Sequence, residues 1–514
     1  MILSLRLLLA SILFWPLAAL AEDVPVALPP VIEQALVDLK SEDEAVQAAA
    51  SQTLVTQGDL TVLPRLEAMR ENADRALRVA IKSVADLLKN KHRLKSPKTD
   101  ERRAAASDLA LSGKPVAVTW LEEALATETD RWVRYSLEES ISLMKLAGEE
   151  PAAKIAAADK LGDLHSQNGL SALKELAGSA GTVGQPGAEA DPQQVALAKA
   201  AAAAVERIET WSAWSSAIET IFRGVSLSSV LLLMSLGLAI VFGLMGVINM
   251  AHGELMMIGA YATFLTQEAF KAHLGEAAFD YYFLLAMPVS FVAAALIGLL
   301  LEATVIRFLY GRPLETMLAT WGVSLILIQL ARVIFGDLTS VVAPSWLSGG
   351  TQVMVGVQLP YNRLFIIALA AVCVAGIYGL LFKTGLGLRV RAVMQNRNMS
   401  ACLGIPTRKV DAYTFAFGSG LAGLAGCALT LIGNVEPGLG QNYIVDSFMV
   451  VVTGGVGKLA GTIVAALGIG GLNKLLEPSF GAVYGKVLIL VLVILFLQRR
   501  PSGLFAIKGR YADS

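Results

Sequence analysis

The chain has few charged residues for its length. Of its 514 residues, 17% are Asp, Glu, Lys or Arg, and 55% are hydrophobic. Soluble proteins carry roughly a quarter charged residues, so this shortage argues against an ordinary soluble protein. The formal net charge of −1 gives no indication of a nucleic-acid partner. Residues from about 22 to 215 are rich in Ala, Lys, Arg, Asp and Glu, whereas residues from about 225 to 498 are mostly apolar. The sequence therefore predicts two unlike parts.

Cysteine is scarce as well, and the polar part has none. The three cysteines all lie in the apolar part, at Cys373, Cys402 and Cys427. No disulfide is available to the polar part, so its compartment must be inferred from the start of the chain. Arg6, an apolar run and the triplet Ala19-Leu20-Ala21 are typical of a secretory signal. We expect residues 1–21 to be a signal peptide, with an uncleaved anchor helix as the alternative. Either way, residues 22–215 are expected on the exported side.

Motifs for catalysis and for nucleotide binding are also missing. No H-E-x-x-H or G-x-S-x-G pattern occurs, which argues against an intramembrane hydrolase. The run from Thr453 to Lys458 looks like a phosphate-binding loop, but Val452 stands where the first glycine is needed. Leu459 follows the lysine where that motif has Ser or Thr. We therefore expect no ATP binding by this chain. The glycines of this region fit close helix packing or a broken helix; they are Gly457, Gly461, Gly468, Gly470 and Gly471.

The polar part contains an internal repeat. An alanine-rich segment at residues 47–54 recurs at 103–109 and at 155–161, a little over 50 residues apart. A second amphipathic segment follows each copy, at residues 63–69, 118–125 and 170–176. Paired helices that repeat in this way predict a HEAT-like α-solenoid, although the period exceeds the roughly 40–47 residues of that class. Such a solenoid offers a surface for binding another protein.

Apolar runs of about the length that crosses a bilayer fill the second part. They lie at about 225–247, 250–270, 282–305, 315–335, 362–382, 411–433, 445–476 and 483–498. Basic clusters at residues 307–312, 383–409 and 499–510 are expected in the cytoplasm. With an exported N-terminus the number of crossings is odd, seven or nine, and residues 445–476 form two short spans or a re-entrant segment. The predicted fold is all-α: a bundle of about eight spans after a periplasmic HEAT-like domain.

Three polar side chains interrupt the first two apolar runs. Asn249, His252 and Glu254 lie where the flanking residues indicate lipid. If residues 249–256 are helical, Asn249, His252 and Met256 share a face and Glu254 points elsewhere. Polar groups at membrane depth line a permeation route in one interpretation. In the other, they form hydrogen bonds that hold neighbouring helices together. The sequence alone leaves both interpretations open.

A basic stretch with apolar members runs from Gly385 to Pro406. Met394, Met399, Leu403 and Ile405 lie among arginines on the expected cytoplasmic side. Apolar side chains on a bare loop are unfavourable, so an amphipathic helix that docks into another protein explains them. The alternative is a basic loop that only sets the membrane orientation.

Four segments resemble the branched-chain amino acid type ABC importer permeases. They are Gly237 to Phe264, the run Leu318 to Leu325 (LATWGVSL), the stretch Arg391 to Ile405, and the closing Arg500-Pro501-Ser502-Gly503-Leu504-Phe505. The resemblance covers nearly all of residues 222–508. Within that family, the exported helical extension and residues 473–478 (NKLLEP) look like the urea transporter permease, as does the ending at residues 503–510.

The resemblance implies a bacterial inner-membrane subunit that forms half of a translocation pathway. It implies a second homologous permease, two cytoplasmic ATP-binding subunits and a periplasmic solute-binding protein, with membrane lipid around the bundle. It implies no cofactor, no metal and no nucleic acid. The expected domains are 22–215 (periplasmic), 222–500 (permease, with a coupling loop at 384–410) and 501–514 (cytoplasmic tail). Asn249, His252 and Glu254 would line the substrate pathway. The residues expected to couple to the ATP-binding subunits are Arg389, Arg391, Leu403, Gly404 and Ile405.

Three alternatives to a urea permease remain. The same machine could carry branched-chain amino acids or short-chain amides. A membrane-anchored periplasmic scaffold would need residues 30–200 for its function and would not depend on ATP hydrolysis. An intramembrane enzyme would turn over substrate as the purified chain alone, and no motif supports it.

Overall fold

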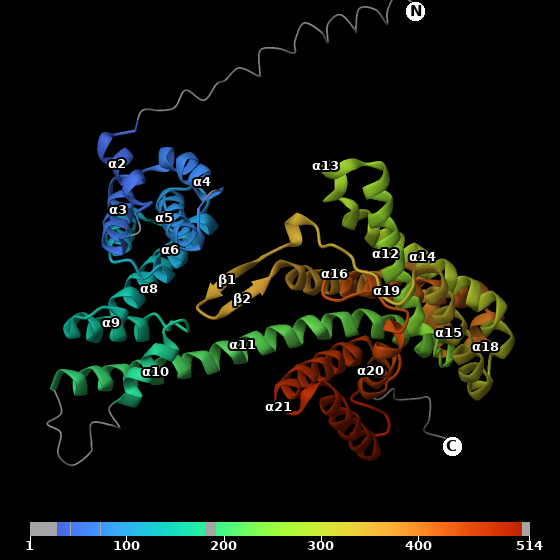
Figure 1. Cartoon of the computed structure of the whole chain (residues 1–514). Helices are drawn as coiled ribbons and strands as arrows, with labels where there is room; N and C mark the ends of the chain where they lie inside the picture. The colour runs from blue at the N-terminus through green and yellow to red at the C-terminus, as the bar shows by residue number, and fades with distance from the viewer. Residues whose placement is uncertain (1–27, 42, 72, 180–191, 506–514) are drawn as a thin grey trace, which may run out of the picture. The chain divides into compact units, whose positions relative to one another are not determined.

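A computed structural model describes residues 28–41, 43–71, 73–179 and 192–505. The chain divides into two compact units after Ser212 (Figure 1). The expected signal peptide, much of the Gly/Pro-rich segment at 178–192 and the tail beyond residue 505 lie outside the described residues.

The first unit consists of helices. They are α2 (Pro30–Asp38), α3 (Glu44–Gln57), η1 (Leu60–Val62), α4 (Leu63–Glu71), α5 (Arg75–Arg93), α6 (Thr99–Leu111), α7 (Val116–Thr127), α8 (Arg131–Ala147), α9 (Pro151–Asp163) and α10 (Leu170–Ser179). The first turns of α3, α5 and α8 are capped by aspartates. The side chains of Asp43, Asp74 and Asp130 accept hydrogen bonds from backbone N–H groups that would otherwise lack a helical partner.

The sequence repeat corresponds to groups of three helices. Helices α3, α6 and α9 carry the alanine-rich segments and begin about 50–55 residues apart. In each segment the third alanine and the next leucine are buried, namely Ala50 and Leu54, Ala106 and Leu109, and Ala158 and Leu161. The expectation of helix pairs was wrong, because α5, α8 and the start of α11 add a third helix to each group. This third helix explains a period longer than two helices require.

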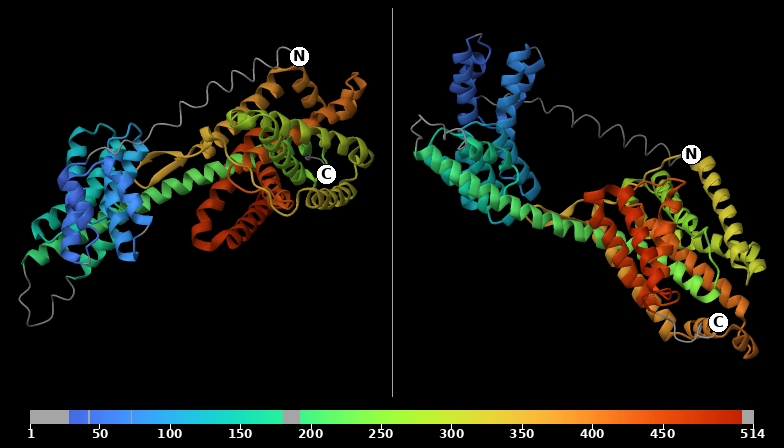
Figure 2. Two further views of the ribbon diagram at one scale, coloured as in Figure 1. Left: turned by 45° about the horizontal axis from the view of Figure 1, so that its top comes forward. Right: turned by 90° about the horizontal axis from the view of Figure 1, so that it is seen from below.

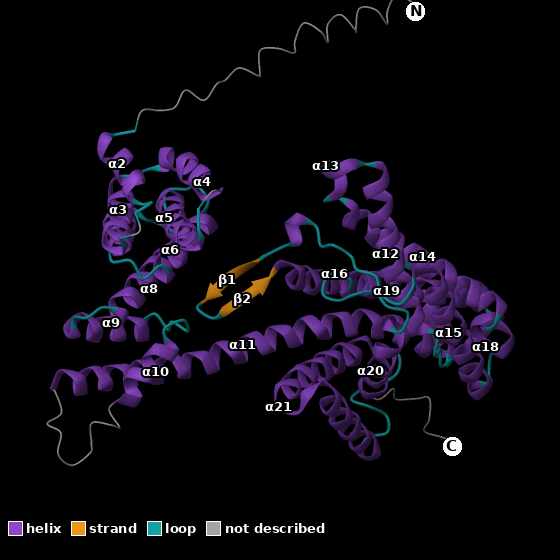
Figure 3. Ribbon diagram, viewed as in Figure 1, coloured by secondary structure: helices purple, strands orange, loops and turns teal. Residues whose placement is uncertain are grey.

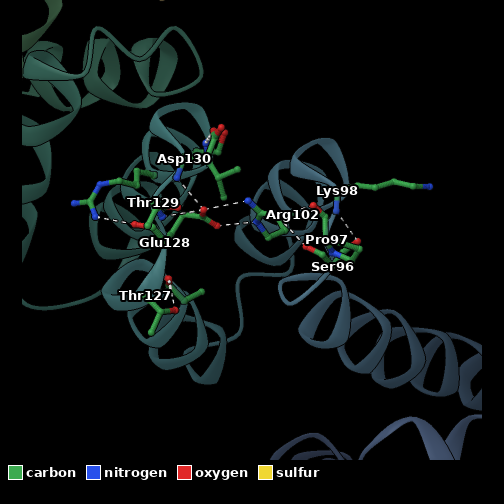
Figure 4. Close-up of polar contacts among 12 residues, drawn as sticks. Ser96, Pro97, Lys98, Arg102, Thr127, Glu128, Thr129 and Asp130 are labelled. Atoms are coloured by element: carbon green, nitrogen blue, oxygen red, sulfur yellow. Dashed lines mark hydrogen bonds and ion pairs between the residues drawn. The ribbon is translucent and has the colours of Figure 1, made fainter.

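An ion pair joins neighbouring helices of the first unit (Figure 4). Arg102 on α6 donates two hydrogen bonds, of 2.7 and 3.1 Å, to the Glu128 carboxylate at the end of α7. The backbone N–H groups of Thr129 and Asp130 also donate to Glu128, each at 3.0 Å. Burial raises the pKa of Glu128, but the Arg102 guanidinium and these N–H groups lower it by more, so it lies below its ordinary value.

The second unit begins within a long helix, α11 (Pro192–Met245), which Figure 2 shows as continuous. Then follow α12 (His252–His273), α13 (Gly275–Phe279), α14 (Tyr282–Thr304), η2 (Ile306–Leu309), α15 (Pro313–Phe335), η3 (Ser345–Leu347), β1 (Gly350–Met354), β2 (Val357–Pro360), α16 (Tyr361–Lys383), α17 (Gly385–Gln395), α18 (Arg397–Cys402), α19 (Thr407–Leu429), α20 (Leu439–Gly454) and α21 (Leu459–Arg499). Strands β1 and β2 form an antiparallel hairpin, which Figure 3 shows in orange among helices.

Six described helices are long and apolar enough to cross a membrane: α11, α14, α15, α16, α19 and α21. Helix α21 is divided at Gly481, whose φ of 77° is not helical, three residues after Pro478. The region predicted to be two short spans or a re-entrant segment consists of α20 and the first part of α21. All the expected apolar runs are helical, but the number of crossings stays a prediction.

Helices α12 and α19 form the interior of the second unit. They pack against each other and against α14. A Cβ added to Gly259 on α12 would lie 2.1 Å from the Gly423 carbonyl oxygen on α19, so only glycine permits this approach. In contrast, α14, α15 and α16 leave most of their apolar side chains exposed, as helices that face lipid do. Close glycine packing is confirmed at Gly461 and Gly470, whereas a Cβ added to Gly468 or Gly471 would meet no atom within 4 Å.

Candidate functional site

The polar cluster lies at a break between α11 and α12. Helix α11 ends at Met245, Gly246 has a φ of +67°, and α12 begins at His252. The Asn249 side chain accepts a 3.0 Å hydrogen bond from the Ala251 N–H, and the Met250 N–H donates to the Thr320 hydroxyl at 3.1 Å. The expectation of one helical face shared by Asn249, His252 and Met256 was therefore wrong, since Asn249 precedes the helix.

His252 and Glu254 occupy the first turn of α12 and are fully buried, with 0% and 1% exposure. The Nε2 atom of His252 lies 3.2 Å from the Met234 carbonyl oxygen on α11, so it must carry the proton in this contact. Ser324 on α15 is a hydrogen-bond partner of the Glu254 carboxyl group. The break therefore places His252 against α11 and Glu254 against α15.

Each member of the cluster keeps one polar atom unpaired. Within the described residues, Asn249 Nδ2, His252 Nδ1 and Glu254 Oε2 are buried and have no hydrogen-bond partner. Leaving such a group unpaired costs about 1–3 kcal/mol. Groups whose only role is to join helices are expected to be paired fully. The three free atoms are what a route for a polar solute would provide.

The basic stretch folds as two short helices joined at Asn396. Thr384 caps α17 through a 3.1 Å bond from the Gly387 N–H, and Asn396 caps α18 through a 2.9 Å bond from the Met399 N–H. Gly404, with a φ of +82°, then turns the chain toward α19. The amphipathic helix expected in this stretch is therefore present as two shorter helices, which the cap residue Asn396 separates.

The two faces of this stretch differ. Val390 and Val393 are buried against Val410, and Ile405 packs beside them. On the outside, four apolar side chains are strongly exposed: Leu386, Leu388, Met399 and Leu403, the last at 76%. Of the expected coupling residues, Arg389, Leu403 and Gly404 are exposed, whereas Ile405 is half-buried. Arg391 instead stacks on the Phe382 ring, with 4.9 Å between its Cζ and the ring centroid.

A buried polar network, which sequence reasoning missed, anchors this stretch. Arg397 on α18 forms an ion pair with Asp411 on α19, whose side chain has no exposure. The same guanidinium lies 5.1 Å from the centroid of the Tyr310 ring. The Tyr310 hydroxyl donates to Glu302 on α14 at 3.2 Å, and Arg307 donates to the same carboxylate at 3.3 Å. The network ties α18 to α14, η2 and α19. Two acidic residues beside basic clusters were the signal that could have indicated it.

Comparison with known proteins identifies relatives of the second unit. A model of the family described as branched-chain amino acid transport system, permease component, matches residues 220–497. The high-affinity branched-chain amino acid transport system permease protein BraD of Pseudomonas aeruginosa is 29% identical over 293 residues, which is 56% of this chain and 95% of that protein. The corresponding LivH protein of Escherichia coli K12 is 28% identical over 299 residues, 56% of this chain and 94% of that protein.

A more distant match is the ribose import permease protein RbsC of Bacillus subtilis. It is 31% identical over 134 residues, 24% of this chain and 41% of that protein. No solved structure matches the chain.

Proposed function

Because the chain belongs to the family of permease components of branched-chain amino acid transport systems, we propose that it is the permease subunit of an ATP-driven importer of urea. Permease components are transport subunits and not enzymes, and the chain is a multi-pass inner-membrane protein. In the proposal it forms half of a translocation pathway, and a second homologous permease forms the other half. Two ATP-binding subunits and a periplasmic solute-binding protein complete the machine.

One observation supports a substrate other than that of the named relatives. Only 56% of this chain aligns with BraD or LivH, yet that part covers 95% and 94% of their own lengths. The family match begins at residue 220, so the first unit has no part in it. An exported helical extension of this kind is the feature that resembles urea permeases. We propose that it is a periplasmic α-helical repeat domain spanning residues 22–215, built from groups of three helices in place of the expected HEAT-like pairs.

The polar cluster suits a small neutral solute with hydrogen-bonding groups. We propose that Asn249, His252 and Glu254 line the pathway, because each offers a buried polar atom that no described residue satisfies. Urea carries both donors and acceptors and no charge, so it could bind there without a charged partner. Branched-chain amino acids are the second candidate, since the relatives named above are permeases for them.

We propose that α17 and α18 form the element that docks on the ATP-binding subunits. The exposed apolar side chains support docking, and the network around Asp411 would transmit movement from α18 to the bundle. Counting α12, α20 and both parts of α21 as crossings gives nine, which keeps this element on the cytoplasmic side.

ATP-dependent uptake of labelled urea and labelled leucine tests the proposal, in vesicles that carry the whole complex. We expect urea uptake that stops when ATP hydrolysis is blocked, with little uptake of leucine. Uptake of leucine alone would replace urea by the second candidate. If neither solute enters in an ATP-dependent way, the proposed importer function is wrong.

A further inference from the structure

A second site lies in the membrane unit, away from the polar cluster. A cavity of about 970 Å³ lies between α11, α16, α17 and the start of α21. Its walls are mostly aliphatic and include Leu232, Leu236 and Ile240 of α11, Val374 of α16 and Ile463 of α21. Asn249, His252 and Glu254 are not among the lining residues. A polar solute gains little in such a groove, so it is not part of the proposed pathway.

Two cations stand at one end of this groove. Arg391 on α17 and Lys458 before α21 both line it. Close packing against the last turn of α11 positions both cations at this end of the groove. A Cβ added to Gly243 would lie 2.7 Å from the Gly457 Cα, next to Lys458. Met245 packs on the cluster of Val390 and Val393, next to Arg391. Both cations therefore lie where α11 ends.

Neither cation is neutralised within the described residues. Arg391 and Lys458 form none of the described ion pairs, and the buried Nε atom of Arg391 has no hydrogen-bond partner. The Phe382 ring, 4.9 Å away, holds the Arg391 guanidinium in place. No side chain caps the N-terminus of α21, and Leu459 and Ala460 of its first turn line the groove too. The helix dipole adds to the positive potential there.

The groove is long as well as apolar. Its lining on α11 extends from Val225 to Ile240, which is about 22 Å at roughly 1.5 Å per residue. That length is more than half of the roughly 30 Å hydrocarbon core of a bilayer. An elongated apolar channel with unpaired positive charge at one end is complementary to an amphiphile that has an acyl chain and an anionic head.

We propose that this groove binds an anionic glycerophospholipid, with its phosphate between Arg391 and Lys458 and an acyl chain along α11 and α16. The occupant follows from charge, because a helix of a partner protein would need an acidic residue at this one end. With the proposed orientation the site faces the cytoplasmic leaflet, but lipid binding itself does not depend on that orientation. The bound lipid would support α17 from the membrane side.

Native mass spectrometry of the purified complex tests the headgroup. After exchange into phosphatidylglycerol or phosphatidylcholine, we expect the permease to retain phosphatidylglycerol. The double variant Arg391→Gln with Lys458→Gln is expected to retain at least tenfold less phosphatidylglycerol. Lys383→Gln, an exposed cation outside the groove, serves as the matched control and should retain the lipid. Equal retention of phosphatidylglycerol by the double variant and the control overturns the anion site. Displacement of the lipid by inorganic phosphate at millimolar concentration would also overturn it, since the acyl chain would then contribute nothing.

A crosslinking arm does not depend on those variants folding. A benzophenone amino acid replaces Ala371, an exposed residue that lines the groove, and the whole complex is irradiated in bilayers that contain phosphatidylglycerol. We expect a mass adduct of phosphatidylglycerol on the permease. A covalent product with the second permease subunit would show that a protein covers the groove and would refute the lipid assignment. Neither readout measures transport, so failure here is separate from failure of the proposed importer function.

Discussion

The two units treat buried polar side chains differently. In the first, Glu139 is 7% exposed and accepts hydrogen bonds from Ser166 and Asn168. Among the described residues, every buried side-chain polar atom without a hydrogen-bond partner lies in the second unit, between Ser226 and Thr453. Unpaired polar groups lower stability, so a fold alone selects against them. Hydrogen bonds pair the buried polar side chains of the first unit within its fold, whereas the proposed pathway would use some of the unpaired atoms of the second.

One arginine–carboxylate pair in each unit puts this comparison to the test. Arg397→Met leaves the fully buried Asp411 without its cation. We expect a loss of about 3 kcal/mol, at the lower end for removal of one partner from a buried pair, because the Arg397 side chain is itself 38% exposed. The measurement is the thermal unfolding midpoint of the purified complex, which should fall.

The matched control for this variant is Arg408→Met, an exposed arginine at the second position of α19 that forms none of the described ion pairs. Adding Asp411→Asn to Arg397→Met removes the uncompensated charge and should recover part of the loss. An unchanged midpoint for Arg397→Met alone would show that the network contributes nothing to the bundle.

The exposed apolar face of α17 and α18 has a counterpart in the first unit. Leu403 and Leu111 are exposed by 76% and 86%, yet only Leu403 belongs to the proposed docking element. Leu403→Asp should weaken docking of the ATP-binding subunits by about 2 kcal/mol, or roughly 30-fold, as loss of an interface anchor does. Leu111→Asp should leave docking unchanged. The yield of co-purified ATP-binding subunits measures both, and full yield with Leu403→Asp would contradict the coupling assignment.

The cluster at the helix break carries the unpaired atoms that distinguish the second unit. His252→Ala removes the free Nδ1 together with the contact to Met234. We expect ATP-dependent uptake to fall about tenfold, or about 1.4 kcal/mol, while the subunits still assemble. Ser419→Ala removes another buried and unpaired atom, on α19, and should leave uptake unchanged. Normal uptake by His252→Ala would assign His252 to helix packing.

Much of the architecture follows from local patterns in the sequence. The runs expected at 282–305, 315–335 and 362–382 became α14, α15 and α16 with nearly the expected ends, because each helix satisfies its own backbone polar groups in lipid. The run expected at 225–247 is instead the last part of the longer helix α11, and those at 445–476 and 483–498 belong to α20 and the divided α21. The repeat was visible because the same alanine and leucine positions are buried in three copies. The third helix of each group was missed even though its start recurs in the first two copies, as Asp74-Arg75-Ala76-Leu77-Arg78 and Asp130-Arg131-Trp132-Val133-Arg134.

The details of the site depend on contacts between distant residues, which no local pattern reveals. Asn249 lies outside the helix because Gly246 takes a positive φ and Thr320, on α15, binds the Met250 N–H. Asp411 was read as the start of an apolar span, whereas its pairing with Arg397 requires α18 to fold back against α19. The sequence indicated which residues were unusual, and tertiary packing decided which of them meet.

The smallest effect is expected for the pair in the first unit. Arg102 and Glu128 keep 16% and 10% exposure, so solvent still reaches both side chains and Arg102→Met should cost only about 1 kcal/mol, the upper end of the range for exposed pairs. The pKa of Glu128 in the folded state lies below its ordinary value of 4.5. Its stabilisation is therefore present above about pH 4.5 and lost as the pH falls through the lower, folded-state pKa.

Hydrogen exchange of residues 96–130 in the whole chain, corrected for intrinsic rates, measures this pH dependence of stability. Protection should fall below pH 4.5 in the unmodified protein and much less in Arg102→Met. Lys89→Met, which breaks an exposed pair with Glu67, should follow the unmodified protein. If all three respond alike to pH, the Arg102–Glu128 pair does not stabilise the fold, and the contrast between the two units loses its best example.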